Sequence, residues 1–538
     1  MEHFQESFTP AETAILTRFF TNVDRPVFGL INLPEVVKGA LFARYSRSSK
    51  SVRRLFLDEF MANPETGIET IAAQLEGVDP LVNLKHAERL YDRVFFEYGD
   101  DSVAQLGGVH LAVEQASNVL TKVLEWGRLA AYLEQSTRYI YYDDKLGDRY
   151  RYQIPPEIAG SPATGEYVGH MDWLFDTYST VVATLTDHFA ARFPRREGDS
   201  NSVWKSTIRA KACDTARGLL PASTLSNLGI YGTGQAYEMA LVRMQAHPLA
   251  EVRVYGQMML AELRKMIPSF LKRVDLPDRG LLASQYQAEI VHRMREIAAG
   301  LDVEPEARGL VTLTDWDPDI ETNLVAAALY SVTDLPDSQL AAMAGRMSGE
   351  EKAKIIAAYV GDRHNRRHKP GRGMERSFYR FDILCDYGGF RDLQRHRMLT
   401  LEWQPLSARL GYDVPADLAE VDPPLVGPWH EAMERAGTYY EKVREDLGID
   451  VAQYVVPFAF NIRFVMQMNA RQAFHLIELR TQPAGHRSYR QVGQEMHRQI
   501  REVAGHHLIA DAMHFVDYTD PDLERLESER RAEERRRS

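Results

Sequence analysis

Apolar and polar residues follow the same order in two separate parts of the chain. The first part opens with an apolar run over residues 27–37, VFGLINLPEVV, followed by a helical pattern over 38–46. The second opens with residues 309–321, GLVTLTDWDPDIE, followed by a helical pattern over 323–331. Because self-similarity of this kind indicates a repeated unit, we interpret the two openings as equivalent.

Two further pairs of segments continue the repeat in the same order. Residues 118–139 and 378–409 are each an apolar segment that leads into a turn containing arginine. Residues 216–247 and 453–486 each read as a helical approach, a proline and a long amphipathic helix. The pattern therefore predicts two copies of one domain.

The length of 538 residues also suits two domains better than one core. The stretch from about residue 274 to 305 contains VDLPDRGLL and the start of GLDVEPEARG around a helical stretch, which is a composition typical of a linker. We place the boundary at residue 300, so that the first domain covers 1–300 and the second 301–538.

Two segments fall outside the repeat. Residues 143–205, which hold PP, GSPATG and RFPRREGDSNS, have no equally long counterpart in the second copy, and we expect this insertion to lie on the surface. The mixed charges of residues 523–538 are typical of a solvated helix end or a frayed tail. An RNA-binding tail is the weaker alternative.

Composition and charge exclude several kinds of protein. A formal net charge of −12 argues against a broad surface for a nucleic acid polymer, so an anion must be bound locally. The N-terminus lacks the pattern of a signal peptide, and no run of about 18 apolar residues predicts a membrane helix. The two cysteines, Cys213 and Cys385, have no partners at metal-ligand spacing and cannot form a disulfide framework. We expect a cytoplasmic protein without a structural metal.

Three short segments could carry chemistry. Arg395, His396 and Arg397 place two guanidinium groups and an imidazole next to one another, which suits phosphates or an electron-rich ring. Taken alone, such a triplet is more often an ordinary surface feature.

The other two segments strengthen this interpretation. In residues 134–139, an extended loop would present Glu134, Ser136 and Arg138 on the same side. In the predicted helix over 469–480, Arg471 and His475 share a face. The alternatives are a surface Glu–Arg pair and a core helix with polar edges.

Together these segments resemble the flavin-dependent thymidylate synthase family, whose signature is an RHR triplet followed by Glu-x-Ser-x-Arg-Tyr. The first copy keeps Arg128 and the residues Glu134, Ser136, Arg138 and Tyr139 at the family's spacing, but Trp126 and Gly127 replace the start of the triplet. The second copy keeps Arg395, His396 and Arg397, while its downstream loop to Ser407 and Arg409 is two residues longer and lacks the glutamate.

The downstream helix divides in the same way. The family's Asn-Ala-Arg, with an arginine nine residues further on, is present as Asn469-Ala470-Arg471 and Arg480, whereas the first copy has Thr233-Gly234-Gln235. The arginine before the family's Leu-Pro is kept as Arg217 in the first copy and is Gln453 in the second. The copies have thus kept opposite sides of one site, which implies one composite active site and one lost site.

The resemblance implies a function and a set of site residues. It implies α+β domains, each a small twisted sheet with long helices, and methylation of dUMP to dTMP with FAD, NADPH and methylenetetrahydrofolate. The implied catalytic residues are Arg480 and Arg397. The implied substrate-binding residues are Glu134, Ser136, Arg138, Arg217, Arg395 and Arg480. The implied cofactor-binding residues are Arg395, His396, Arg397, Glu375, Asn469, Arg471, His475 and His486.

Some of these residues depart from the family's pattern. His475 replaces an asparagine, and His368 and His486 match family histidines only with two-residue shifts. Two alternatives therefore stay open: a flavin enzyme with a different pyrimidine or carbon donor, and a noncatalytic nucleotide-binding paralogue. A homodimer would recreate the family's four-domain assembly.

Overall fold

The computed structural model describes residues 1–62, 107–197 and 199–520. The chain forms two compact units. Unit 1 comprises residues 1–184, 219–304 and 430–456, and unit 2 comprises 185–218, 305–429 and 457–538. The charged tail predicted over 523–538 lies outside the described residues, and the division of the two copies at residue 300 stays a prediction.

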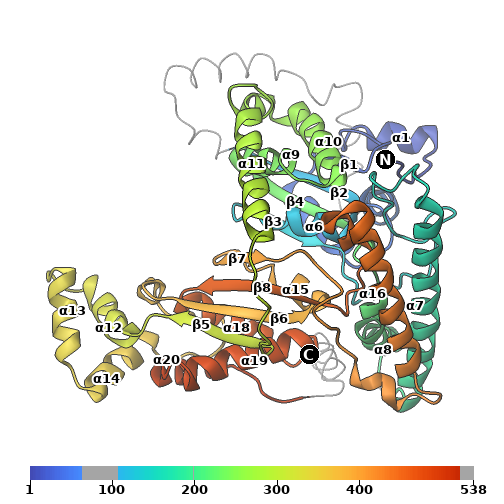
Figure 1. The fold of residues 1–538 in the computed structure, drawn as a ribbon. Helices are drawn as coiled ribbons and strands as arrows, with labels where there is room; N and C mark the ends of the chain where they lie inside the picture. The colour runs from blue at the N-terminus through green and yellow to red at the C-terminus, as the bar shows by residue number, and fades with distance from the viewer. Residues whose placement is uncertain (63–106, 198, 521–538) are drawn as a thin grey trace. The chain divides into compact units, whose positions relative to one another are not determined.

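Unit 1 contains an antiparallel sheet of four strands (Figure 1). The order is β1 (Val27–Leu30), β2 (Gly108–Ser117), β4 (Leu225–Thr233) and β3 (Ala130–Glu134). The register of β2 against β4 shifts between Val113 and Ala116, and Gln115 has a φ of 55° there. The sheet thus carries a bulge in its longest strand.

Unit 2 contains a sheet of the same topology. The order is β5 (Val311–Trp316), β6 (Tyr379–Asp386), β8 (Asn461–Met468) and β7 (Thr400–Trp403), again antiparallel throughout. The equivalence of the two openings is visible in β1 and β5, each followed by a helix whose C-cap is a serine, Ser46 or Ser331. The α+β fold and the tandem arrangement are therefore confirmed.

Helices surround both sheets. Those of unit 1 are α1 (Pro10–Leu16), α2 (Glu35–Tyr45), α3 (Val52–Leu55) with the π-helix η1 (Phe56–Met61), α6 (Asn118–Leu124), α9 (Gly234–Gln245), α10 (Ala250–Met266), η5 (Pro268–Leu271), α11 (Gly280–Ala299), α17 (Ile449–Ala452) and η8 (Gln453–Val455). Those of unit 2 are α8 (Asn201–Ala216), α12 (Ile320–Tyr330), α13 (Asp337–Arg346), α14 (Gly349–Val360), η6 (Arg372–Glu375), α15 (Tyr387–Leu393), η7 (Ala416–Glu420), α18 (Ala470–Arg480), α19 (Arg487–Glu502) and α20 (His507–Ala512). Helices α7 (Thr164–Arg192) and α16 (Val426–Leu447) and the turn η4 (Arg217–Leu219) contribute residues to both units. None of the helices described is both long enough and apolar enough to cross a membrane.

Each unit includes a segment from the other copy of the sequence. Residues 430–456 of the second copy belong to unit 1, where Ala222 N donates to Val456 O over 2.8 Å and Ser223 N donates to Tyr454 O over 2.9 Å. Residues 185–218 of the first copy belong to unit 2, where Ala459 N donates to Gly218 O over 2.9 Å. Each unit is therefore assembled from both copies.

A long amphipathic helix is predicted after each proline. This prediction is wrong for the residues that directly follow the proline. In both copies the proline is followed by a strand, β4 or β8, which turns directly into a shorter helix, α9 or α18. The side chains of β8 alternate strictly between half-buried and buried, which is the period of a strand with one face in the core. Thr233 and Asn469 cap the two helices by accepting hydrogen bonds from backbone N–H groups.

The expected surface position of the 143–205 insertion is also wrong. Helix α7 occupies much of this segment, and Tyr167, Met171, Leu174, Phe175 and Tyr178 are fully buried. Their separations of four, three, one and three residues place them on one apolar face of the helix. The segment therefore contributes to the core.

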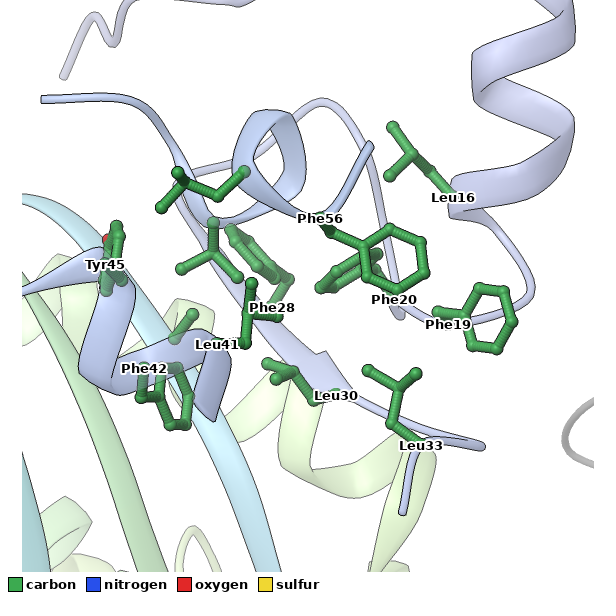
Figure 2. Close-up of a cluster of buried hydrophobic side chains, with 13 residues drawn as sticks. Leu16, Phe19, Phe20, Phe28, Leu30, Leu33, Leu41, Phe42, Tyr45 and Phe56 are labelled. Atoms are coloured by element: carbon green, nitrogen blue, oxygen red, sulfur yellow. The ribbon is translucent and has the colours of Figure 1, made fainter. Parts of the chain in front are cut away.

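Aromatic side chains anchor the N-terminal part of unit 1. Phe20 lies edge-on to both Phe28 and Phe56, with ring centroids 5.6 and 5.3 Å apart. Figure 2 shows these rings packed with Leu16 and Leu41 around β1 and α2. This cluster fixes the edge strand β1 to the helices that precede and follow it.

Candidate functional site

Three arginines of unit 2 surround the carboxylate of Asp392. The shortest distances to its oxygens are 3.8 Å from Arg217 Nη1, 3.5 Å from Arg395 Nη1 and 3.7 Å from Arg480 Nη1. The Asp392 carboxylate thus faces three positive charges, and the neighbouring Asp386, which also interacts with Arg217, has its pKa raised to about 7 by burial. The net positive cluster suits a ligand with several anionic oxygens, since guanidinium groups offer charge-assisted donors to such groups.

The start of helix α15 makes room for Arg217. Asp386 caps this helix by accepting a hydrogen bond from Gly389 N at 2.9 Å. At Gly388, a Cβ would lie 3.2 Å from Arg217 Nε, so the missing side chain allows the guanidinium to approach the helix backbone. Arg217 is 3% exposed, and its Nη2 has no hydrogen-bond partner among the described residues. This buried donor fits an anionic ligand.

Arg480, the last residue of α18, is held in place from three sides. Its Nε donates to His396 Nε2 at 2.9 Å, its Nη2 donates to the carbonyl of Asp392, and its guanidinium carbon lies 5.3 Å from the centre of the Tyr489 ring. Burial lowers the pKa of Arg480, while the neighbouring Asp392 raises it. The group is thus preorganised beside the arginine cluster.

His396 is neutral in this environment. Burial and the charge of Arg480 lower the pKa of His396 well below its ordinary value. Its Nδ1 lies 3.2 Å from the Gln472 side-chain amide. Because Nε2 accepts from Arg480, the single proton of the neutral ring belongs on Nδ1, and the Gln472 amide must then turn its oxygen, in place of Nε2, toward Nδ1 to accept that proton. The His475 ring lies 5.3 Å from that of His396, and burial lowers its pKa to about 4.

A second group of charges surrounds Glu375. Its carboxylate accepts hydrogen bonds from Arg471 Nη1 at 3.2 Å and from Arg372 Nη2 at 3.1 Å. Arg471 Nε also donates to the carbonyl of Pro370 at 2.9 Å. Burial, with Arg471 nearby, lowers the pKa of Lys369. Glu375 thus orients Arg471, and basic side chains predominate around both.

The structure gives two of the predicted cofactor residues roles as helix caps. Asn469 Oδ1 accepts a hydrogen bond from Gln472 N at 2.9 Å, and His486 Nδ1 accepts one from Ser488 N at 3.3 Å. Arg397 and His368 are exposed. The role of Asn469 and His486 in cofactor binding stays a prediction.

In unit 1, the extended loop predicted over residues 134–139 is wrong, because residues 137–139 form a turn. Glu134 is buried at the end of β3, with Oε2 3.2 Å from Lys122 Nζ. Ser136 Oγ accepts a hydrogen bond from Arg138 N at 3.3 Å, and both residues are half-buried. Glu134 is therefore buried while Ser136 and Arg138 are half-buried, so the three side chains do not share one exposed side of the loop.

Sequence reasoning missed Asp392, Gln472 and Tyr489. Asp392 had a usable signal, since it lies three residues before Arg395, within reach along one turn of chain. Gln472 and Tyr489 carried no comparable signal, because their contacts join residues far apart in the sequence.

Comparisons with known proteins identify a family that both copies match. Residues 43–269 and 312–505 match the family described as thymidylate synthase complementing protein. The chain is 38% identical over 528 residues to a UPF0159 protein of Chlamydia muridarum, covering 97% of this chain and 98% of the relative. A UPF0159 protein of Chlamydia pneumoniae is 39% identical over 534 residues, with 98% and 99% covered.

More distant matches carry functional names. A flavin-dependent thymidylate synthase of Clostridium tetani is 26% identical over 223 residues, covering 40% of this chain and 83% of that protein. A solved structure of a UMP/dUMP methylase from Streptomyces cacaoi, bound with 5-Br dUMP, is 19% identical, covers 41% of this chain and all of that one, and has a TM-score of 0.31. Because the family match covers both copies and most of the chain, the protein belongs to the thymidylate synthase complementing protein family.

Proposed function

We propose that this protein is an FAD-dependent thymidylate synthase that methylates dUMP to dTMP in one composite site built from both copies. The observation that carries the proposal is the cluster around Asp392. Arg217 from the first copy and Arg395 and Arg480 from the second belong to one compact unit, with a buried arginine donor unused by the described residues. The named relative from Clostridium tetani supports a flavin cofactor.

The residues divide into two proposed roles. Ser136, Arg138 and Arg217 would bind the phosphate of dUMP, with Glu134 and Arg395 completing the substrate set. Arg397, His396, Glu375, Asn469, Arg471, His475 and His486 would contact the flavin, together with Arg395. The polar and cationic side chains around Glu375 fit a phosphorylated cofactor.

In the proposed reaction, carbon 5 of the uracil ring gains a one-carbon unit from methylenetetrahydrofolate and loses its proton, and NADPH provides the two electrons that complete the methyl group. A bound flavin would supply the transfer of electrons and of the carbon unit. Arg480 would stabilise negative charge developing on the pyrimidine. His396 and the Asp392 carbonyl hold its guanidinium before the reaction, so little reorganisation is needed.

The test begins with the absorbance of the purified protein after incubation with FAD. The bound flavin is then reduced, and its reoxidation is followed after addition of dUMP and methylenetetrahydrofolate. The product is identified by chromatography. We expect thymidylate, and a loss of roughly 100-fold or more in Arg480→Ala and Arg138→Ala. Arg498→Ala is the control, because this exposed arginine of α19 pairs only with Glu495 and Glu502 among the interactions described.

The other outcomes distinguish the alternatives. Failure to bind FAD would overturn the proposal and favour a noncatalytic paralogue. Flavin binding without thymidylate formation would favour a different pyrimidine or carbon donor, an alternative suggested by the lengthened loop from Arg397 to Arg409. A cytoplasmic location and NADPH as the reductant are part of the same proposal.

A further inference from the structure

A strongly basic loop connects helix α14 with the turn η6 in unit 2. Residues 363–372 read RHNRRHKPGR and contain five arginine or lysine side chains and two histidines, in a chain whose formal net charge is −12. Arg367, Lys369 and Arg372 are exposed, and Arg366 is half-buried. The roles proposed above use none of Arg366, Arg367 and Lys369.

Neighbouring elements hold the backbone of this loop in place. At its start, the Arg363 guanidinium pairs with the buried carboxylate of Glu478, and its Nε donates to the carbonyl of His368 at 2.6 Å. At its end, Arg471 Nε of helix α18 donates to the carbonyl of Pro370 at 2.9 Å. These anchors fix the course of the loop beside α18.

Three cations of the loop lack an acidic partner. Among the residues that the structure describes, Arg366, Arg367 and Lys369 form no ion pair, whereas Arg372 of the same loop pairs with Glu375 at 3.1 Å. Exposed arginine and lysine side chains can donate charge-assisted hydrogen bonds to carboxylates and phosphates alike. The loop therefore offers donors to an anion from outside the protein.

Positive charges gather where the loop meets α18. Burial, with the charges of Arg471 and Arg366, lowers the pKa of Lys369. Burial, followed by the charges of Lys369 and Arg366, lowers the pKa of His475 to about 4. The loop cations thus lie close to the residues proposed to contact the flavin. Like charges in such an arrangement repel one another, and a bound anion would offset this repulsion.

The ligand that suits this loop carries several negative charges at one end. A single exposed ion pair contributes little, so a ligand gains from the loop only by placing charges beside more than one of the three cations. Both co-substrates of the proposed reaction have such an end, because folates carry a chain of glutamates and NADPH carries the phosphates of its adenosine half. We propose that Arg366, Arg367 and Lys369 bind the anionic tail of a co-substrate whose reacting part lies at the proposed active site, an inference that rests on the proposed function.

Equilibrium binding distinguishes the two sources of the tail. Isothermal titration calorimetry of the FAD-loaded protein compares methylenetetrahydrofolate carrying one glutamate with the form carrying five, and NADP⁺ with NAD⁺, which lacks the 2′-phosphate. No turnover occurs, because dUMP is absent. We expect the more highly charged member of one pair to bind about 10-fold more tightly. Raised ionic strength should reduce the difference, since exposed charges are screened.

A triple variant tests the three residues. Replacing Arg366, Arg367 and Lys369 with glutamine should abolish this preference and leave the affinity for the less charged member of the pair unchanged. Circular dichroism and thermal unfolding establish that the variant is folded.

The control removes the same total charge from exposed positions of the same unit. Replacing Arg346, Lys354 and Arg498 with glutamine should leave the preference intact.

The remaining outcomes separate this inference from the proposed reaction. Equal affinity within both pairs, a preference that the triple variant retains, or the absence of binding by all four ligands would overturn the inference. Binding that depends on the tail and on the three cations, in a protein that forms no thymidylate, would support the inference and overturn the proposed reaction.

Discussion

Arg217 Nη1 lies 3.8 Å from Asp392 Oδ2, within one compact unit, although the two residues come from different copies of the repeated domain. Both side chains are largely buried, at 4% and 12% exposure. Arg395 and Arg480 share the same carboxylate. Asp392 therefore provides the negative charge that allows three arginines to lie together in the folded protein.

Replacing Asp392 with asparagine should lower the free energy of unfolding. It should also increase the stabilisation that added anions give to the folded protein. The largely buried Arg217 and Arg480 would lose their counterion, at a cost of about 3 kcal/mol in the free energy of unfolding. Inorganic phosphate should restore part of this loss by binding the folded state. Urea denaturation with and without phosphate measures both effects. The control Asp315→Asn breaks an exposed pair with Arg380 and should cost less than about 1 kcal/mol; an equal cost in both variants would contradict the prediction.

Asp386 should make stability depend on pH. Burial raises its pKa to about 7, although Arg217 opposes the shift. A carboxyl group whose folded pKa exceeds its unfolded value contributes stability at low pH, and this contribution is lost as the pH rises from about 4 to about 7. Asp386→Asn keeps a side chain that can cap α15 and removes the titration. Unfolding measurements should therefore show the natural protein losing a few kcal/mol more than the variant over this range; parallel curves would show that Asp386 does not titrate there.

The repeat was predictable because its evidence is local. Apolar runs and helical spacing over 27–46 and 309–331 identified the equivalent openings, and the RHR triplet stood in one stretch of sequence. Strands β4 and β8 were harder, because their eight or nine residues merge with the helices that follow. A short apolar run without a break does not distinguish strand from helix.

The exchange of segments could not be predicted from the pattern, because it depends on contacts between distant residues. In unit 1, for example, the Tyr454 hydroxyl of the second copy donates to Glu251 Oε2 of the first copy at 2.6 Å. Two buried serine–acid pairs also depend on contacts between distant residues. In unit 1, Ser117 Oγ donates to Glu251 Oε2 at 2.6 Å, and in unit 2 Ser488 donates to Asp386. Ser117 and Asp386 cap equivalent helices, so the acid and the hydroxyl have exchanged positions between the copies. Neither copy alone reveals this pairing.

Glu134 should contribute to stability as well as to any binding. Its buried carboxylate lies 3.2 Å from Lys122 Nζ, and Lys122 also contacts Glu125 at 2.6 Å. Glu134→Gln leaves a buried lysine with one partner fewer, and we expect a loss of about 3 kcal/mol in the free energy of unfolding. Glu35→Gln is the control, because Glu35, which pairs with Lys38, is 70% exposed. Loss of dUMP binding at unchanged stability would instead assign Glu134 to the ligand alone.

His396 should stay uncharged through the physiological range, because its Nε2 must accept the hydrogen bond from Arg480. Burial and Arg480 lower its pKa well below the ordinary value, and the pKa of His475 is lowered to about 4. Nitrogen-15 NMR spectra of protein carrying isotope-labelled histidine should show no titration of His396 between pH 5 and 8. The variants His396→Gln and His475→Gln assign the signals. A depressed folded pKa contributes stability above the unfolded value near 6.5, and this contribution is lost as the pH falls toward the folded pKa. The natural protein should therefore lose more stability than His396→Gln on acidification below pH 6.5. A His396 signal that titrates near pH 6.5 would show that Arg480 does not donate to a neutral ring, and the proposed preorganisation of Arg480 would then have to rest on Asp392 and Tyr489.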